Sequence, residues 1–189
     1  MSATVLYWRR TDEEGLERLE IAVEPDGVAV RGTVLCLEAG GLQLDHHWSL
    51  DAAWRTRWAF VERRDARGRE GLRLERAGRG WTVDGVARPD LDGADEPDLS
   101  VTPFCNTLPI RRLAAAPGAA LELDVALVDG ATLTVTRSRQ RYARKGPGLV
   151  RFTALGPTSP GFEADLAVDA DGLVLRYEYL FERIARTDA

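Results

Sequence analysis

Hydrophobic and polar residues alternate along most of this chain, and a period of two is typical of β-strands with one buried face. The clearest early example is 28–36, where every second residue is apolar or small. Further stretches of the same kind are 42–44, 52–60, 72–74, 81–83, 121–127, 131–135, 162–168 and 173–181. Turn signals such as Asp84-Gly85 and Asp129-Gly130 separate them. The pattern predicts many short strands joined by hairpins.

Two segments depart from this rhythm. Residues 13–21 are compatible with a short helix, while 88–104 hold three prolines among acidic side chains and predict an irregular surface loop. No linker and no repeat of 20–50 residues is present, and a length of 189 residues suits one domain, 1–189. We therefore expect a mainly β protein: a single domain of curled, largely antiparallel sheet, an open barrel or half-barrel, with little helix.

Composition narrows the range of functions. A net charge of −5 and a pI near 5.2 argue against a nucleic-acid surface, which needs cations to neutralise phosphates. No run of 18 apolar residues predicts a transmembrane segment, and the first 20 residues do not resemble a signal peptide. The expectation is a cytoplasmic protein in which Cys36 and Cys105 are free thiols.

No residue pattern predicts catalysis or a metal site. His46 and His47 are the only histidines, and neighbours on a strand point to opposite faces, so one exposed and one half-buried imidazole is expected. The acidic residues of 90–98 lack the spacing of a calcium loop, and no nucleophile or phosphate-binding motif occurs. We expect no catalytic residue, metal or cofactor.

Arginine occupies every second position of 137–141, opposite Ser138, Gln140 and Tyr142. Such a stripe predicts a solvated face paired with acids, or else a face that recognises anions. Trp54 and Trp58 are expected to share one face, where they would fill a core or line a pocket.

Five separated motifs carry a resemblance to a known family. They are DAAWRTRWAFVE at 51–62, GWTVDGVARPDLDGADEPDLS at 80–100, TPFCNTLPIRRL at 102–113, QRYAR at 140–144 and VDADGLVLRYEYLFERI at 168–184. Together they resemble the glycolipid-binding family of bacterial proteins, over about residues 20–185. The resemblance implies a curled antiparallel sheet like that of lipoprotein-carrier proteins, and glycolipid binding by analogy of shape.

The resulting hypothesis is a non-enzymatic protein that holds a glycolipid or other amphiphile in an apolar concavity with a polar, arginine-bearing mouth. The alternatives are an enzyme acting on a lipid or sugar substrate, and a protein-interaction module that uses a sheet edge. The motifs nominate seven ligand-binding residues: Trp54, Arg55, Asn106, Arg111, Arg112, Gln140 and Tyr142.

Arg111 and Arg112 carry the most specific geometric expectation. In extended backbone, adjacent side chains face opposite ways, so one arginine should point inward and the other to solvent. An inward arginine needs a partner, because a buried unpaired charge is costly. Asp98 is the nearest acid of the motifs, and a ligand headgroup is the functional alternative.

Overall fold

A computed structural model describes residues 2–37 and 40–188. One sheet of fifteen strands runs in the order β8-β7-β6-β5-β4-β3-β2-β1-β15-β14-β13-β12-β11-β10-β9. The strands are β1 Ser2–Arg10, β2 Gly15–Glu24, β3 Gly27–Cys36, β4 Leu42–Leu50, β5 Thr56–Asp65, β6 Gly68–Ala77, β7 Gly80–Val83, β8 Val86–Arg88, β9 Glu96–Leu99, β10 Ala120–Val128, β11 Val135–Gly146, β12 Leu149–Ala154, β13 Glu163–Val168, β14 Val174–Tyr177 and β15 Phe181–Asp188. Every pairing is antiparallel except β9 with β10.

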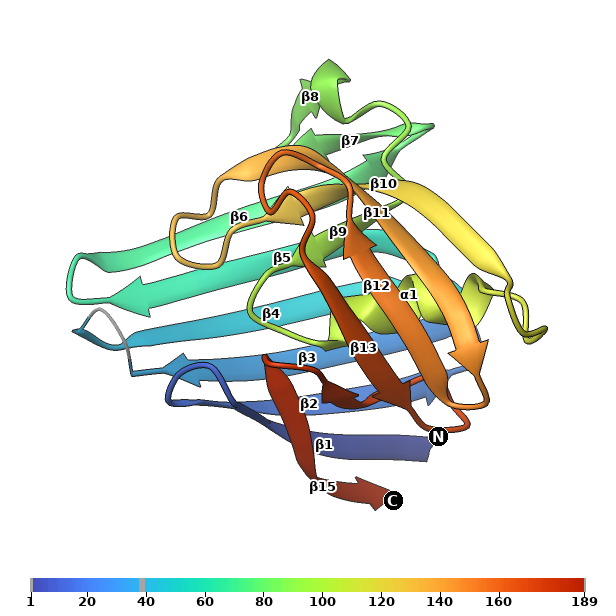
Figure 1. Ribbon diagram of the computed structural model, residues 1–189. Helices are drawn as coiled ribbons and strands as arrows, with labels where there is room; N and C mark the ends of the chain where they lie inside the picture. The colour runs from blue at the N-terminus through green and yellow to red at the C-terminus, as the bar shows by residue number, and fades with distance from the viewer. Residues whose placement is uncertain (1, 38–39, 189) are drawn as a thin grey trace.

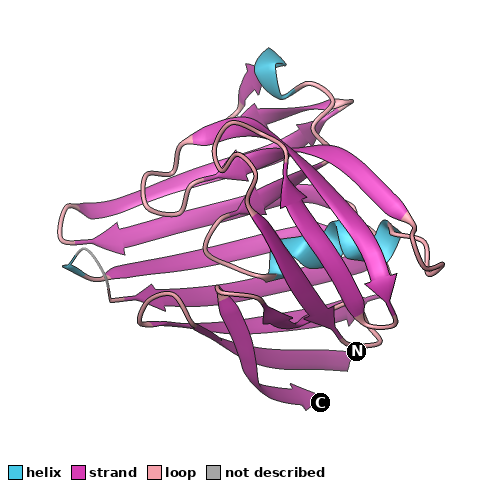
Figure 2. Ribbon diagram, in the orientation of Figure 1, coloured by secondary structure: helices cyan, strands magenta, loops and turns pink. Residues whose placement is uncertain are grey.

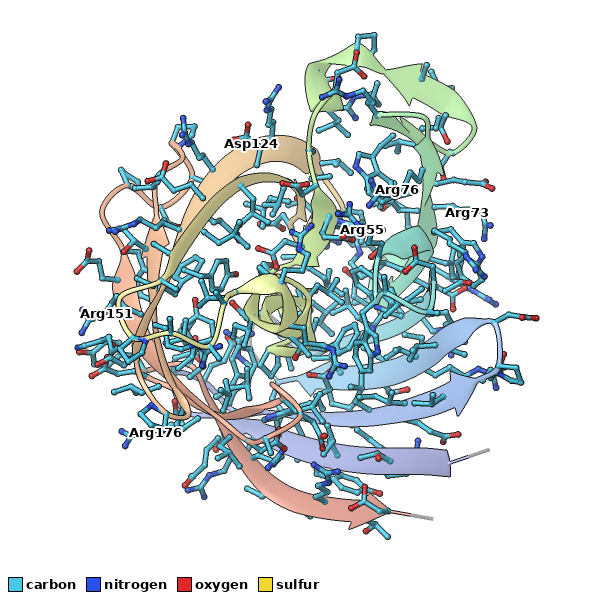
Figure 3. The ribbon with its side chains drawn as sticks, turned by 90° about the vertical axis from the view of Figure 1, so that its right-hand side faces the viewer. Arg55, Arg73, Arg76, Asp124, Arg151 and Arg176 are labelled. Carbon is cyan, nitrogen blue, oxygen red and sulfur yellow. The ribbon has the colours of Figure 1, made fainter. Side chains whose placement is uncertain are left out.

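The sheet curls so that β10–β13 pass in front of β1–β6, and the helix α1 (Phe104–Arg112) lies in the space between them (Figure 1). Figure 2 shows how little other helix there is, and from the side the strands curve around α1, which is seen end on (Figure 3). The predicted fold class, a mainly β domain of curled sheet that does not close, is confirmed. Among the described residues, no helix is long and apolar enough to span a bilayer.

Residues 101–110 are all buried, so α1 fills the concavity of the sheet. The helix contains Pro109 and is too short to be stable alone, so tertiary packing must hold it. Phe104 meets the edge of Trp48 at 5.8 Å between ring centroids. This corrects the prediction for 88–104: the segment holds a 3₁₀ turn at Pro89–Leu91, strand β9 and the start of α1, and much of it is buried.

Buried polar groups fix α1 to the inner face of the sheet. Thr102, just before the helix, donates to Glu17 Oε1 at 2.7 Å, and the same oxygen lies 2.9 Å from His46 Nε2. Trp48 donates to His46 Nδ1 at 2.9 Å, so Nε2 carries the ring proton that faces Glu17. Gly32 leaves room for the imidazole, since any side chain there would occupy the same space. His46 is therefore fully buried and His47 half-buried, rather than one half-buried and one exposed.

Four local predictions were wrong. Residues 15–21 belong to strand β2 and not to a helix, because Glu17, Leu19 and Ile21 point inward in alternation. The chain turns at 51–55 before β5 begins, so Trp54 and Trp58 do not share a strand face.

The other two wrong predictions are strands that are interrupted at non-glycine residues with positive φ. Leu133 (φ 55) lies in the turn that precedes β11, and Tyr179 (φ 72) lies in the turn between β14 and β15. The predicted strands 131–135 and 173–181 are interrupted there, since left-handed backbone ends the extended run.

The two ends of the open sheet meet along a seam made by side chains instead of a backbone ladder. Arg76 donates to the carbonyl oxygens of Thr56 at 2.7 Å and Asp95 at 2.6 Å, and its guanidinium lies 3.4 Å from Glu96. Trp81 Nε1 donates to the carbonyl of Ala94 at 3.0 Å. These bonds satisfy edge groups that would otherwise be free to pair with another chain. The arginine fork suits this role, because it offers several donors in fixed directions.

Both cysteines are free, as predicted, and both are buried. Desolvation raises the pKa of each thiol, and for Cys105 the nearby Asp98 carboxylate adds to the effect. The thiols are therefore small buried side chains held in the protonated form.

Replacing Arg76 by alanine should destabilise the fold by about 3 kcal/mol, because Glu96 would lose a charged neighbour and two carbonyl groups would lose their donors. Arg73→Ala is the matched control. Arg73 stacks on Trp58 but pairs only with exposed Glu75, so its loss should cost less than about 1 kcal/mol. Urea unfolding followed by tryptophan fluorescence measures both. Equal midpoints for the two variants would show that the seam does not hold the sheet.

Candidate ligand-binding site

A cavity of about 460 Å³ opens between β9 and the strands β11–β15, a volume within the range of small-molecule sites. Its lining combines acids, amides, hydroxyls and aromatic rings. The residues are Asp98, Leu99, Ser100, Thr102, Asn106, Leu127, Asp129, Thr132, Thr134, Thr136, Ser138, Gln140, Phe152, Ala154, Thr158, Ser159, Phe162, Tyr177, Leu180 and Phe181.

One wall of the cavity is aromatic. Phe152, Phe162 and Tyr177 meet pairwise at 5.9–6.4 Å between ring centroids, and Phe181 adds a further ring 6.3 Å from Tyr177. These side chains come from β12, β14, β15 and the segment before β13, which the sheet order places close together. They present a continuous apolar surface to whatever enters the cavity.

The facing wall is polar and comes from β11. Thr136, Ser138 and Gln140 alternate along this strand and point into the cavity. Arginine fills the intervening positions and faces outward, where Arg137 pairs with Asp124 at 2.5 Å and Arg139 with Glu122 at 2.8 Å. The stripe is thus a solvated face paired with acids, one of the two roles that the sequence allowed.

At the base of the cavity, four polar side chains form a connected group, here called the floor network: Asp98, Asn106, Gln140 and Tyr142. Gln140 Nε2 donates to Asp98 Oδ2 at 2.5 Å. The Tyr142 hydroxyl lies 2.9 Å from Asn106 Oδ1 and 3.1 Å from Gln140 Oε1, and donates its single proton to this pair of acceptors. The network joins β9, α1 and β11, so it fixes the amide of Gln140 and the carboxylate of Asp98 in place.

The surroundings of Asp98 shift the pKa of its carboxyl group. The carboxylate is half-buried, and this desolvation raises its pKa above the usual value, although the hydrogen bond from Gln140 acts in the opposite direction. Burial likewise raises the pKa of Tyr142, with the charge of Asp98 as the second cause. Tyr142 therefore stays a hydroxyl donor at any physiological pH.

The seven nominated residues fall into two groups at opposite ends of α1. Asn106 and Gln140 line the cavity, and Tyr142 lies directly behind them. The other four, Trp54, Arg55, Arg111 and Arg112, lie near the C-terminal end of α1 and outside this cavity. Arg55 is exposed, on the same side of the helix as Arg76 (Figure 3).

Arg111 and Arg112 lie on a helix, so the expected extended backbone was wrong. Arg111 stacks over Trp54, 4.0 Å from the ring centroid, and donates to the carbonyl of Asp171 at 2.6 Å. Arg112 turns inward, and its guanidinium lies 3.6 Å from Asp95 and 3.8 Å from Glu96. One arginine does point inward, but its acidic neighbours are these two residues, while Asp98 pairs with Gln140.

Trp54 contacts the C-terminal end of α1 from a strained turn. Its φ of 63° is in the left-handed region, which a bulky residue adopts only when its surroundings enforce it. Asp51 Oδ1 accepts from the backbone of Ala53 and Arg55 at 2.8 and 2.9 Å, and Arg111 covers the indole. Through these contacts, the motif residues at this end hold the turn at 51–55 against the helix.

Sequence reasoning missed the aromatic wall and the position of Asp98 at the floor of the cavity. Phe152, Phe162 and Tyr177 sit at inward positions of alternating segments, a pattern equally typical of a filled core. The acidic cluster around Asp98 suggested a surface turn, and only the pairing of β9 with β10 brings this carboxylate under β11.

Asp98→Asn should raise the melting temperature relative to wild type, and the gain should grow from pH 4 to pH 8. A carboxyl whose pKa is raised by folding contributes stability below its unfolded pKa, and that contribution is lost as pH rises through the folded pKa. The asparagine cannot ionise, so it escapes this loss. Differential scanning fluorimetry across the range measures the difference, with Asp26→Asn on an exposed turn as the control. A gain that shrinks towards pH 8 would contradict the assignment.

Comparison with known proteins agrees with the family resemblance of the sequence motifs. The family model described as "Putative glycolipid-binding" matches residues 5–183, so the resemblance seen in the motifs is confirmed and begins nearer the N-terminus. A crystal structure of a DUF1089 family protein from Pseudomonas aeruginosa is similar, with 32% identity and a TM-score of 0.78 over 89% of this chain and 92% of that chain. A search among curated proteins gave no match. The family match covers nearly the whole sheet together with α1, and the chain belongs to the glycolipid-binding family.

Proposed function

We propose that this protein binds the sugar-bearing end of a glycolipid in the cavity beside α1, without a chemical step. The observation that carries the proposal is the division of the cavity into an aromatic wall and a facing wall of hydroxyl, amide and carboxylate groups. A sugar ring has an apolar face of C–H groups and a rim of hydroxyls, so it matches both walls at once.

The location of the cavity differs from the expected apolar concavity. Helix α1 fills the middle of the curled sheet, and the remaining space lies between β9 and β11–β15. A volume of about 460 Å³ suits the head of an amphiphile better than a whole glycolipid. In this proposal the hydrocarbon tail extends past the rim, along Leu127 and Leu180.

A binding role fits the carboxylates better than hydrolysis does. Glycoside hydrolases need two carboxylates that flank the bond to be cleaved. Asp98 and Asp129 are the only acids that line the cavity among the described residues. Asp129 Oδ1 already accepts from the backbone of Ala131 and Thr132 at 3.0 and 2.8 Å and holds the turn before β11. Asp98 is then the single carboxylate left to act on a sugar, and one of its oxygens is bound to Gln140, so the pair that hydrolysis needs is incomplete.

Filling the cavity from its rim should weaken ligand binding strongly and leave the fold intact. Thr136 is exposed and lines the cavity, so Thr136→Trp places an indole in the space proposed for the ligand. Arg141→Trp is the matched control, because it lies on the same strand with its side chain on the outer face. We expect octyl glucoside, titrated below its micellar concentration, to bind the control like wild type and the first variant roughly tenfold or more weakly, about 1.4 kcal/mol.

Isothermal titration calorimetry gives the affinities, and melting temperatures confirm that both variants fold. Equal affinity for Thr136→Trp and wild type would show that the amphiphile binds elsewhere. Absence of binding by the wild type to octyl glucoside, and of any copurifying lipid in native mass spectrometry, would overturn the proposed function itself.

A further inference from the structure

The cavity is lined by negative charge alone. Among the described residues, Asp98 and Asp129 are its only charged members, and no arginine, lysine or histidine joins them. The nearest arginines on β11 point to the opposite face of the sheet and are paired there with Asp124 and Glu122. An anion inside the cavity would meet no cation.

The Asp98 carboxylate at the floor of the cavity is partly removed from water, which disfavours its charged form. Asp98 is half-buried, and its side-chain hydrogen bonds come from the amide of Gln140 and the thiol of Cys105, neither of which carries a positive charge. Like charges close together in a poorly solvated space repel strongly. A phosphate, sulfate or carboxylate group beside Asp98 would add a second unpaired charge, which the site has no means to offset.

The hydroxyl groups of a ligand, in contrast, would find hydrogen-bonding partners in the cavity. Tyr177 and Ser138 line the cavity, and the two residues are 7% and 6% exposed. Both residues place a hydroxyl, which can donate and accept a hydrogen bond, in the lining of the same space, so a ligand that carries hydroxyl groups can bond to both. Burial raises the pKa of the Tyr177 phenol, with the Asp98 charge as the second cause, so the phenol stays protonated and can donate a hydrogen bond.

We infer that the cavity selects uncharged, hydroxyl-bearing headgroups, such as a neutral sugar, and rejects anionic ones. The Asp98 carboxylate accepts from ligand hydroxyls, Tyr177 and Ser138 complete the polar contacts, and Phe152 and Phe162 cover the apolar face of the ring. This inference rests on the proposed function and specifies its ligand class. It also replaces the arginine-bearing mouth expected from the sequence, because the arginines of that motif lie at the other end of α1.

The direct test compares two amphiphiles that differ only at C6 of the sugar ring, which is a hydroxymethyl group in one and a carboxylate in the other. Octyl glucoside and octyl glucuronide share ring and tail, and the second carries a carboxylate at pH 8. Wild-type protein should bind the glucoside roughly tenfold or more tightly. Asp98→Asn should narrow this ratio several-fold by strengthening glucuronide binding, whereas Asp124→Asn, on the outer face, should leave the ratio unchanged.

Ser138→Ala provides a second variant that removes a hydroxyl without altering charge. It should weaken glucoside binding several-fold and leave the ratio between the two amphiphiles near the wild-type value. If the glucuronide binds wild type as tightly as the glucoside, the inference is overturned while the proposed function stands. If neither compound binds the wild type, both fall together. An unchanged ratio in Asp98→Asn, with the variant folded, would show that this carboxylate does not select the ligand.

Discussion

The helix inside the sheet is the constraint on which the remaining structure depends. A sheet of fifteen strands that curls without closing leaves a concavity, and water there would face the inward side chains of most strands. Helix α1 fills this space with a segment whose residues 101–110 are all buried. The helix could not persist alone, and the sheet could not keep its curvature around an empty centre, so each element stabilises the other.

A buried helix brings polar groups with it, and the way they are satisfied creates the site. Thr102 bonds to Glu17 at one end, while the tyrosine of the floor network bonds to Asn106 one turn later. The polypeptide that leads into α1 also carries β9, which pairs with β10 and brings Asp98 beneath β11. The carboxylate and amide at the cavity floor are thus held by the contacts that seat the helix. Ligand contacts can then form without reorganisation of the floor, which favours affinity.

The strands could be predicted because inward and outward residues alternate, and β11 shows how far this extends. Its arginines and its polar residues were assigned to opposite faces from the sequence, and the polar face lines the cavity. Helix α1 could not be predicted in this way, since a helix buried on every side has no amphipathic period. The aromatic wall was missed for a related reason. Alternation marks Phe152 and Tyr177 as inward, but residues from distant strands decide whether the space before them is filled or open.

In the proposed complex, a sugar-bearing amphiphile occupies the space between the aromatic wall and β11. Intermolecular nuclear Overhauser effects between octyl glucoside and the protein test it most directly. We expect cross-peaks from the sugar ring protons to the rings of Phe152, Phe162 and Tyr177. Cross-peaks to the indole of Trp54, in the separate groove beside Arg111, with none to the aromatic wall, would contradict it.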